Sequence, residues 1–427
     1  MLLKNEKRPG YKKTKVGWIP DDWKCVPLGQ VFKKRTARGK QGVPVFSVTQ
    51  DRGMIRRSSL ERRTGNDVTA DKSLLVEPGD VAYNMMRMWQ GAVAVCEERC
   101  VISPAYVVCR PNVDQVDSNF MFSYFKSKAG MHKLFAYSYG VTADRLRLYY
   151  EDFGLVPAPL PSLHEQIAIA EVLACWDKAI QTLTLKIETK RLTQKRLMHR
   201  LLSGEQRLPG YSKRWKDVRL GQLGEFSKGA GISKEELSTK GVPCIRYGEI
   251  YTVHSFVLKE FHSFINPALA AISVKIRTND LLFAGSGETA EEIGKSVAYM
   301  DKADAYAGGD VILLSVNPAK GRADYLSYYL NTIGRRELNK LGQGQSVVHI
   351  YPKNLSKVNL ALPPLEEQLA IAAVLSVAIR EINALEHKLV LLKDQKKFLL
   401  NNLVTGTIRL PQFCKAARKG DRHEYTV

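Results

Sequence analysis

The sequence predicts an α+β protein with two similar globular domains, separated by two long helices that form an antiparallel coiled coil with pseudo-two-fold symmetry. Three observations predict this fold: the chain repeats itself after about 200 residues, each copy ends in a long heptad pattern, and short β-rich runs precede each pattern. The 427 residues, 44% of them hydrophobic, are enough to build more than one packed core.

The internal repeat is clearest where each predicted helix begins. The segment LPSLHEQIAIAEVL at 160–173 matches LPPLEEQLAIAAVL at 362–375 in 10 of 14 positions, with a constant offset of 202. Solenoid repeats have periods of only about 20 to 50 residues, so a period this long indicates a duplicated domain followed by a helix. We therefore expect domain 1 at 1–159, a helix at 160–204, domain 2 at 205–361, a helix at 362–406 and a basic, disordered tail at 407–427.

The two predicted helices carry a coiled-coil seam. Apolar residues recur in alternating steps of three and four at the same phase in both copies, with prolines just upstream and glycines just downstream. About 39 residues at a rise of 1.5 Å would give a rod of about 58 Å, which argues against helices buried in an ordinary core. The expected seam residues are Ile180, Leu183, Ile187, Leu197 and Leu201 in the first helix and Ile382, Leu385, Leu389, Leu399 and Leu403 in the second.

Both globular segments combine strands and short helices. The runs at 75–84, 102–112 and 308–318 are rich in β-formers and are bounded by Gly, Pro or Asn, which indicates strands. Helix-like segments begin at equivalent places, Ser118 and Ala323. Away from these motifs the two domains diverge strongly, although the helices do not.

The charge of the chain indicates a polyanionic partner. Lysine and arginine number 64 against 43 acidic residues, which gives a formal net charge of +21. No apolar run approaches the roughly 18 residues of a membrane span, and the first residues lack the apolar stretch of a secretion signal. We therefore expect a cytoplasmic protein without a membrane partner.

Catalytic and metal-binding signatures are not found in the sequence. Six residues separate Gly287 from Gly294, where a phosphate-binding loop needs four. None of the seven cysteines forms a pair with the two-residue gap of zinc and redox motifs, so we expect structural thiols. We predict no catalytic residue and no metal site.

Nucleic-acid contacts are expected from two kinds of residue. Basic runs attract phosphates without regard to sequence, whereas Arg, Asn, Gln, Ser and His on turn-rich loops can read base edges. Solvated surface is the competing interpretation for each, and Met85, Met86, Trp89 and Tyr149 are expected in the core rather than stacked on bases. The candidates are Lys33, Lys34, Arg35, Asn84, Arg87, Gln90, Arg145 and Arg147 in domain 1, and Ser286, Glu288, Thr289, Lys295, Gln343, Gln345, Ser346 and His349 in domain 2.

From about Gly17 to Leu410 the chain resembles the specificity subunit of type I restriction-modification systems. The resemblance rests on the duplicated LPxLxEQxAIAxVL helix, on GWIPDDW near the start, and on SG or TG after each helix. It implies a non-catalytic subunit in which each globular domain, a target-recognition domain, reads one half of a bipartite site in double-stranded DNA. The paired helices would set the spacer between the halves.

The resemblance also implies partners. Two modification subunits, which bind S-adenosylmethionine and methylate adenine, would dock on the helices, and restriction subunits would translocate and cleave DNA. The chain itself would bind no cofactor.

Two other classes of function remain open at this point. One is a self-sufficient DNA methyltransferase or endonuclease, which the missing catalytic motifs disfavour. The other is a coiled-coil scaffold that binds nucleic acid or protein without reading sequence, which a selection from random oligonucleotides would distinguish.

Overall fold

A computed structural model describes residues 8–39, 42–59, 72–142, 145–289, 292–343 and 348–414. The chain divides into two compact units: unit 1 comprises Met1–Thr184 with Lys388–Val427, and unit 2 comprises Leu185–His387. Each long helix therefore contributes one half to each unit. Most of the tail predicted at 407–427 lies outside the described residues, from 415 onward.

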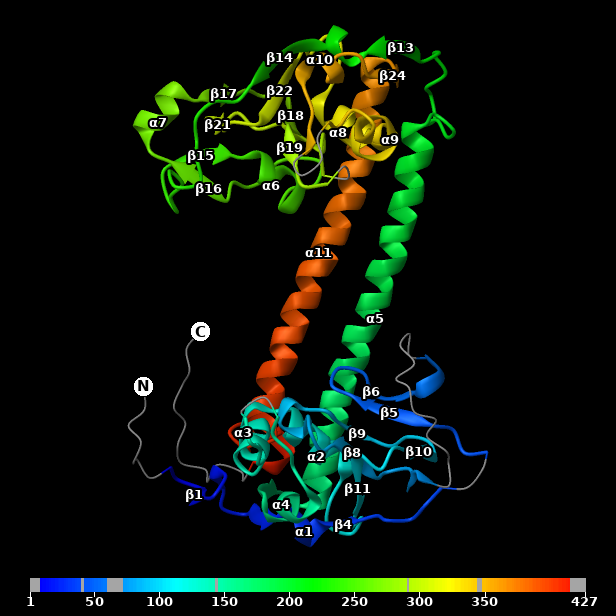
Figure 1. Cartoon of the computed structure of the whole chain (residues 1–427), viewed down its shortest axis with the longest axis vertical. Helices are drawn as coiled ribbons and strands as arrows, with labels where there is room; N and C mark the ends of the chain where they lie inside the picture. Colours follow the sequence, from blue (N-terminus) through cyan, green and yellow to red (C-terminus); the bar gives the residue numbers. More distant parts are fainter. Residues whose placement is uncertain are drawn as a thin grey trace. The chain divides into compact units, whose positions relative to one another are not determined.

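The core of unit 1 is a four-stranded antiparallel sheet in the order β4-β11-β8-β9 (Figure 1). Alternate residues of β8 contribute to two cores: Val81 and Tyr83 to one that includes α2, and Ala82 to another beneath the β5–β6 hairpin. Because both faces of β8 are covered, the three successive residues Val81, Ala82 and Tyr83 are all buried. The strands are β4 (Phe32–Lys34), β5 (Phe46–Thr49), β6 (Gly53–Arg56), β8 (Val81–Asn84), β9 (Val93–Val95) and β11 (Tyr106–Pro111); the helices are α2 (Ser118–Lys126), α3 (Lys128–Ala136) and α4 (Tyr150–Leu155).

Unit 2 repeats this sheet and adds a second one. Its central sheet has the order β14-β22-β18-β20, and β18 again alternates between two cores, with Leu281 and Phe283 in one and Leu282 in the other. The second sheet has the order β16-β15-β21-β17. The elements are β14 (Gly224–Lys228), β15 (Val242–Ile245), α6 (Tyr247–Thr252), β16 (Ser263–Ile265), β17 (Val274–Ile276), β18 (Asp280–Ala284), β20 (Ser296–Tyr299), β21 (Ala305–Ala307), β22 (Val311–Val316) and α8 (Ala323–Thr332).

The two predicted long helices are α5 (Leu163–Leu202) and α11 (Leu365–Leu403), coloured green and orange in Figure 1. All ten predicted seam residues are buried or half-buried in helices whose other positions are mostly exposed. Within unit 1, Lys396 near the end of α11 forms an ion pair with Asp177 near the start of α5, at 2.5 Å. Within unit 2, Lys190 and Arg191 of α5 pair with Glu381 and Glu386 of α11, at 2.8 and 2.7 Å.

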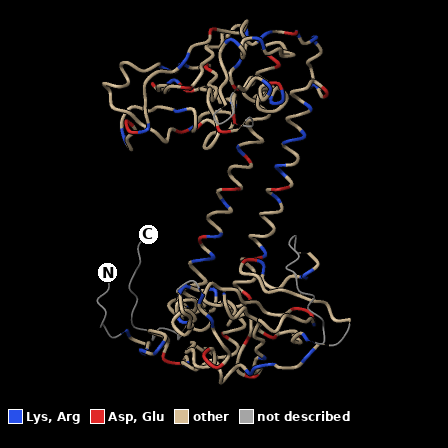
Figure 2. Tube along the Cα trace, in the orientation of Figure 1, with Lys and Arg blue, Asp and Glu red and all other residues tan. Residues whose placement is uncertain are grey.

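These ion pairs show that the helices run antiparallel, because in each unit residues toward the end of one helix meet residues toward the start of the other. Figure 2 shows basic and acidic residues distributed along both helices, as this pairing requires. Exposed ion pairs stabilise a fold by less than about 1 kcal/mol each, so the apolar seam provides most of the stability and the ion pairs favour one register. The α+β fold with two long antiparallel helices is confirmed.

One glycine at a helix end is required by its surroundings. Gly406, just after α11, has a φ of 70°, and an added Cβ would lie 2.4 Å from Cδ of Pro20. Any other residue there would strain the backbone and collide with the start of domain 1.

Among the described residues, α11 is long and apolar enough to cross a membrane by length and composition, which the sequence analysis did not anticipate. The seam accounts for one apolar face of this helix. In unit 1, the exposed apolar side chains Val390, Leu391 and Phe398 add to its hydropathy, with Phe398 58% exposed.

Candidate nucleic-acid interface

In unit 1, the turn after β8 projects polar and apolar side chains from the sheet. Oδ1 of Asn84 accepts a hydrogen bond from the backbone N–H of Met86 at 2.9 Å, which folds the turn. A short 3-10 helix follows, η3 (Met88–Gln90), and the buried Met88 anchors it to the core. Arg87 and Met86 are therefore exposed, whereas Gln90 is half-buried.

A second segment lies beside this turn. The backbone N–H of Leu148 donates to the carbonyl of Met85 at 2.9 Å, and Arg147 exchanges two backbone hydrogen bonds with Tyr139. Because this segment is extended, its side chains alternate: Leu146 and Leu148 are buried, whereas Arg145, Arg147 and Tyr149 are exposed. Nη1 of Arg147 donates to the Tyr149 hydroxyl at 3.3 Å.

The turn and the extended segment together form one exposed surface, which we call the arginine–tyrosine surface. Guanidinium groups can donate to two base acceptors at once, and aromatic rings can stack on bases, so this composition suits DNA contact. It consists of Met86, Arg87, Tyr139, Arg145, Arg147 and Tyr149.

The expectation that Met86 and Tyr149 belong to the core is wrong. Met86 is 51% exposed and Tyr149 is 42% exposed, because the Asn84 turn and the alternation of the extended segment direct them outward. Met85 and Trp89 are half-buried, and the indole N–H of Trp89 donates to the carbonyl of Met86. Tyr139, 61% exposed, was missed, since a single tyrosine beside a glycine gives no sequence pattern of its own.

The basic run that begins on β4 and continues to Arg35 contains residues with different roles. Lys33 is exposed, and Lys34 pairs with the exposed Glu151 at 3.3 Å. Arg35 instead pairs with Asp80, whose side chain is 1% exposed, with Nε 2.5 Å from Oδ2. The Asp80 carboxylate also accepts from the backbone N–H of Glu77, so the structure gives Arg35 a role in neutralising a buried turn-forming carboxylate.

In unit 2, the candidate residues converge on a small two-stranded ladder. Strand β19 (Ser286–Gly287) pairs with β23 (Val348–His349), and the Ser286 Oγ lies 2.9 Å from Nδ1 of His349. Ser286 is 2% exposed and His349 is half-buried, so the serine orients the ring. When the hydroxyl donates to Nδ1, the neutral ring carries its proton on Nε2, which becomes a donor for a base acceptor.

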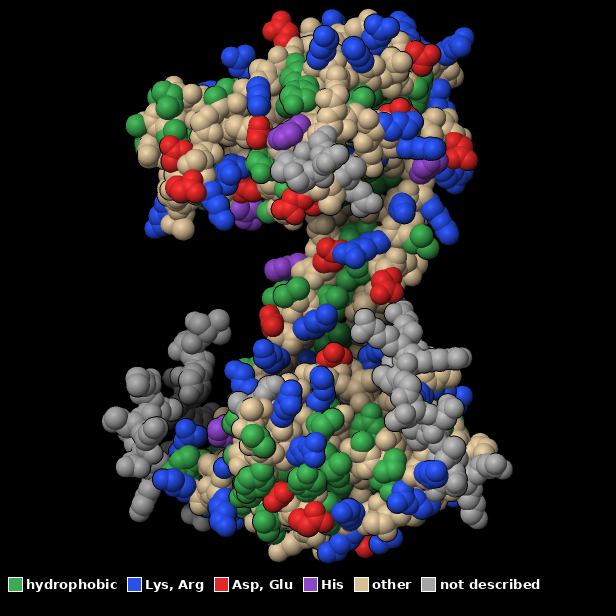
Figure 3. Space-filling view, viewed as in Figure 1, with side chains coloured by type: hydrophobic (Ala, Val, Ile, Leu, Met, Phe, Trp, Pro, Cys, Tyr) green, Lys and Arg blue, Asp and Glu red, His purple; other side chains and the backbone are tan. Residues whose placement is uncertain are grey.

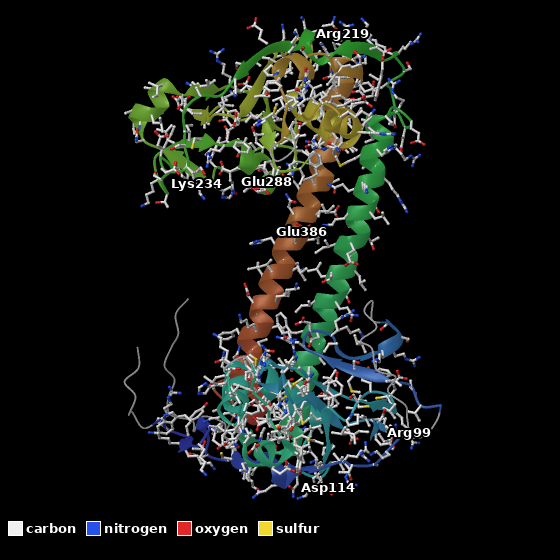
Figure 4. The ribbon with its side chains drawn as sticks, in the orientation of Figure 1. Arg99, Asp114, Arg219, Lys234, Glu288 and Glu386 are labelled. Atoms are coloured by element: carbon white, nitrogen blue, oxygen red, sulfur yellow. The ribbon has the colours of Figure 1, made fainter. Side chains whose placement is uncertain are left out.

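Two further loops border this ladder. Gln343 is exposed and exchanges two backbone hydrogen bonds with His349, at 2.9 and 2.8 Å. The backbone N–H groups of Glu288 and Thr289 both donate to the Glu292 carboxylate, which folds their turn and leaves both side chains exposed. Figure 4 shows Glu288 and Lys234 at one edge of unit 2, with Arg219 at the opposite edge. Gln345 and Ser346 lie outside the described residues.

Lys295 has a structural contact. Its ammonium group donates to the backbone carbonyl of Tyr251 in α6 at 3.1 Å. Burial lowers its pKa, and the nearby Arg335 lowers it further, because both disfavour a charge at this position. Like Arg35, Lys295 is therefore half-buried and bound to its own domain rather than fully exposed.

The remaining basic residues are widely distributed. Figure 3 shows Lys and Arg side chains scattered over the visible face of each unit rather than gathered in one dense patch. Such a distribution attracts a phosphate backbone without selecting a sequence. No group of three or more potential metal ligands occurs among the residues that the structure describes.

The structure thus has two unlike domains with exposed polar loops, each built on one end of a helix pair, and these loops are the candidate nucleic-acid surfaces. Residues 212–392 match the family described as the type I restriction modification DNA specificity domain. In this part, the chain is therefore similar to the specificity subunits of type I restriction-modification systems.

Relatives of full length show the same similarity. The chain is 23% identical over 450 residues to a putative type I restriction enzyme MjaX specificity subunit of Methanocaldococcus jannaschii, covering 96% of this chain and 99% of the relative. It is 23% identical over 435 residues to the MjaVIII specificity subunit of the same organism, covering 96% and 98%. The fold is similar to the crystal structure of a type I S subunit from M. genitalium, with a TM-score of 0.56, 14% identity and coverage of 94% and 99%.

Replacing Arg35 by alanine should lower the free energy of unfolding of unit 1 by about 3 kcal/mol, because it leaves the buried Asp80 charge without its partner. Lys33→Ala, a change at an exposed position two residues earlier in the same basic run, is the matched control and should have little effect. Urea denaturation measures both. Equal, small effects of the two substitutions would show that Arg35 is a surface residue in solution.

Proposed function

We propose that this chain is the non-catalytic DNA-recognition subunit of a type I restriction-modification complex, in which each globular domain reads one half of a bipartite double-stranded site. The observation that carries the proposal is a duplicated frame with unlike reading surfaces. The two helix starts are identical at 10 of 14 positions, whereas unit 1 exposes the arginine–tyrosine surface and unit 2 exposes the ladder around His349.

The chemistry of the two surfaces suggests that the two half-sites differ. An arginine guanidinium on an exposed turn favours guanine, because guanine O6 and N7 can accept two parallel hydrogen bonds from it in the major groove. Unit 2 offers instead the His349 ring N–H of the ladder, together with the Thr289 hydroxyl and the Gln343 amide from the loops that border it. These groups suit a different pattern of base donors and acceptors. The net charge of +21 would supply the sequence-independent part of the affinity.

Catalysis would reside in the partners. We propose that two modification subunits dock on the helices, using exposed apolar side chains such as Val390, Leu391 and Phe398, and methylate adenine with S-adenosylmethionine that they bind themselves. Restriction subunits would add translocation and cleavage, and this chain would bind no cofactor. The complex would act on DNA in the cytoplasm.

The direct test is a selection from random double-stranded DNA by this chain in the presence of its modification subunits. The expected result is one motif of two short defined parts separated by an undefined gap. Recovery of no motif would support a scaffold without sequence specificity. Methylation or cleavage by the chain alone would support a self-sufficient enzyme.

Substituting one reading surface should change one half-site only. We expect Arg147→Ala to weaken binding about tenfold through the half read by unit 1, and His349→Ala to do the same for unit 2, since each removes a base-edge donor. Competition binding with DNA altered in either half measures this. Arg219→Ala, at the edge of unit 2 opposite Glu288, removes a positive charge away from the proposed reading surface and is the control, so it should leave the preference for each half unchanged.

Lengthening both helices should change the gap. Four residues inserted after Lys186 and after Lys388 add about 6 Å to each helix at matching points. The preferred gap should then lengthen, as measured by methylation of substrates with graded spacers. A four-residue insertion after Glu98, in the exposed turn between β9 and β10 (Cys100–Ile102), should leave the gap unchanged. The proposal that the helices set the spacer fails if the helix insertions also leave it unchanged.

A further inference from the structure

Each long helix begins with a buried glutamate that binds a tryptophan and an arginine. In unit 1, Glu165 is 2% exposed, and its Oε2 accepts from the indole N–H of Trp23 at 3.0 Å. The guanidinium of Arg409 donates to both carboxylate oxygens, from Nε at 2.9 Å and from Nη2 at 2.6 Å. We call these three residues the unit 1 Trp–Glu–Arg cluster.

Unit 2 contains the same cluster at equivalent sequence positions. Glu367 is fully buried, and its Oε2 accepts from the indole N–H of Trp215 at 3.1 Å. Arg207 donates to the two oxygens at 2.6 and 2.7 Å, and its guanidinium lies 5.4 Å from the centroid of the Trp215 ring. Two domains with different surfaces therefore share one internal arrangement.

The arginine of each cluster comes from the other repeat. Arg207 follows α5, yet it binds the glutamate at the start of α11. Arg409 follows α11, yet it binds the glutamate at the start of α5. Each cluster thus joins three parts of the chain: the entry to a domain, the start of the helix that follows this domain, and the segment after the end of the other helix.

The glutamine beside each glutamate extends the connection into the domain. In unit 1, Oε1 of Gln166 accepts from the backbone N–H of Asp117, the N-cap of α2, at 2.9 Å. In unit 2, Oε1 of Gln368 accepts from the backbone N–H of Arg322, the N-cap of α8, at 3.1 Å. Helix α8 packs on β18 and β20, and α2 shares its core with β8, so the Glu–Gln pair links each sheet to the helix pair.

The geometry of the clusters restricts rotation. A bidentate guanidinium–carboxylate pair is planar and permits one relative orientation, and the indole N–H adds a third fixed direction. The pKa of Arg409 is raised, mainly by its hydrogen bonds to Glu165, which shows that the charged pair is favoured in the fold. The shared apolar core also holds each domain to the helices, but apolar contacts have little direction, so the clusters add the directional restriction.

We infer that the two Trp–Glu–Arg clusters are positioning devices that fix the orientation of each reading domain on the helix pair and thereby restrict the complex to one gap length. The inference rests on the proposed function. Glu165, Arg409, Glu367 and Arg207 are positioning residues, because their side chains bind one another and would act on DNA reading only through the domain. Without these hydrogen bonds each domain can rotate further on the helix pair, and the complex can then bind the same half-sites at neighbouring gap lengths.

The test uses the full chain with its modification subunits and the double variant Arg207→Lys with Arg409→Lys. Lysine keeps the positive charge but cannot donate two parallel hydrogen bonds. Substrates carry the two selected half-motifs separated by every gap within a few base pairs of the native one. Methylation at the native gap relative to its neighbours should fall about tenfold or more, while the bases required in each half stay the same.

Two further variants separate positioning from stability. Val108→Ala removes two buried methyl groups from the core beneath the β5–β6 hairpin of unit 1, and that core contains no residue of the Trp–Glu–Arg cluster. The substitution should therefore lower the free energy of unfolding and leave the gap preference intact. Trp23→Phe with Trp215→Phe removes the indole donors together with part of each buried ring but keeps the guanidinium–carboxylate pairs, so it should broaden the gap range more mildly. If the double lysine variant does not assemble with its modification subunits, this double phenylalanine variant provides the gap-range measurement instead.

The inference is overturned if the assembled cluster variants keep the native gap preference, or if Val108→Ala broadens the range as much as they do. Failure of the proposed function looks different. In that case the wild-type complex itself recovers no two-part motif, whereas here the wild type reads one gap and the variants read several.

Discussion

The apolar seam between α5 and α11 is the constraint on which the rest of this structure depends. Neither globular domain completes its core alone: Ile169, Leu173 and Leu403 belong to the main core of unit 1, and residues from both helices belong to that of unit 2. A helix of 40 residues with one apolar stripe needs a partner along its length, and the heptad phase aligns the two stripes. Each domain is therefore built on the start of one helix and the end of the other.

This arrangement explains which parts of the duplicated sequence stay alike. The seam, the Glu–Gln pair and the glycines after the helices all have buried partners, so most substitutions there would leave a cavity, a buried charge or strained backbone. The turn that carries Arg87 and the loop that carries Thr289 have exposed side chains, and folding tolerates many residues at such positions. A shared frame and two unlike surfaces therefore occur within one chain, which is what the proposed recognition of two different half-sites requires.

The helices were predictable from the sequence because heptad spacing is a local pattern, and the seam positions follow from it directly. The roles of single basic residues were not, because they depend on distant partners. Arg35 appears in the sequence as one of a basic run, but Asp80, its partner, is 45 residues away, and the carbonyl that binds Lys295 belongs to Tyr251. Met86 and Tyr149 were expected in the core because hydrophobicity predicts burial on average, whereas a turn and an extended segment decide which side chain points outward.

The use of a charged cluster at each helix start needs a physical reason, because apolar residues could fill the same space. Removing a carboxylate and a guanidinium from water costs several kcal/mol, and a buried ion pair often gains no more than it costs, so stability alone does not favour this choice. An apolar contact, however, allows sliding and rotation by small steps, since dispersion has little direction. A carboxylate bound by one indole N–H and two guanidinium N–H groups has one geometry, and any departure leaves a buried charge unsatisfied. The same solution occurs in both units beneath unlike reading surfaces, so what it constrains is the placement of each domain rather than the bases it reads.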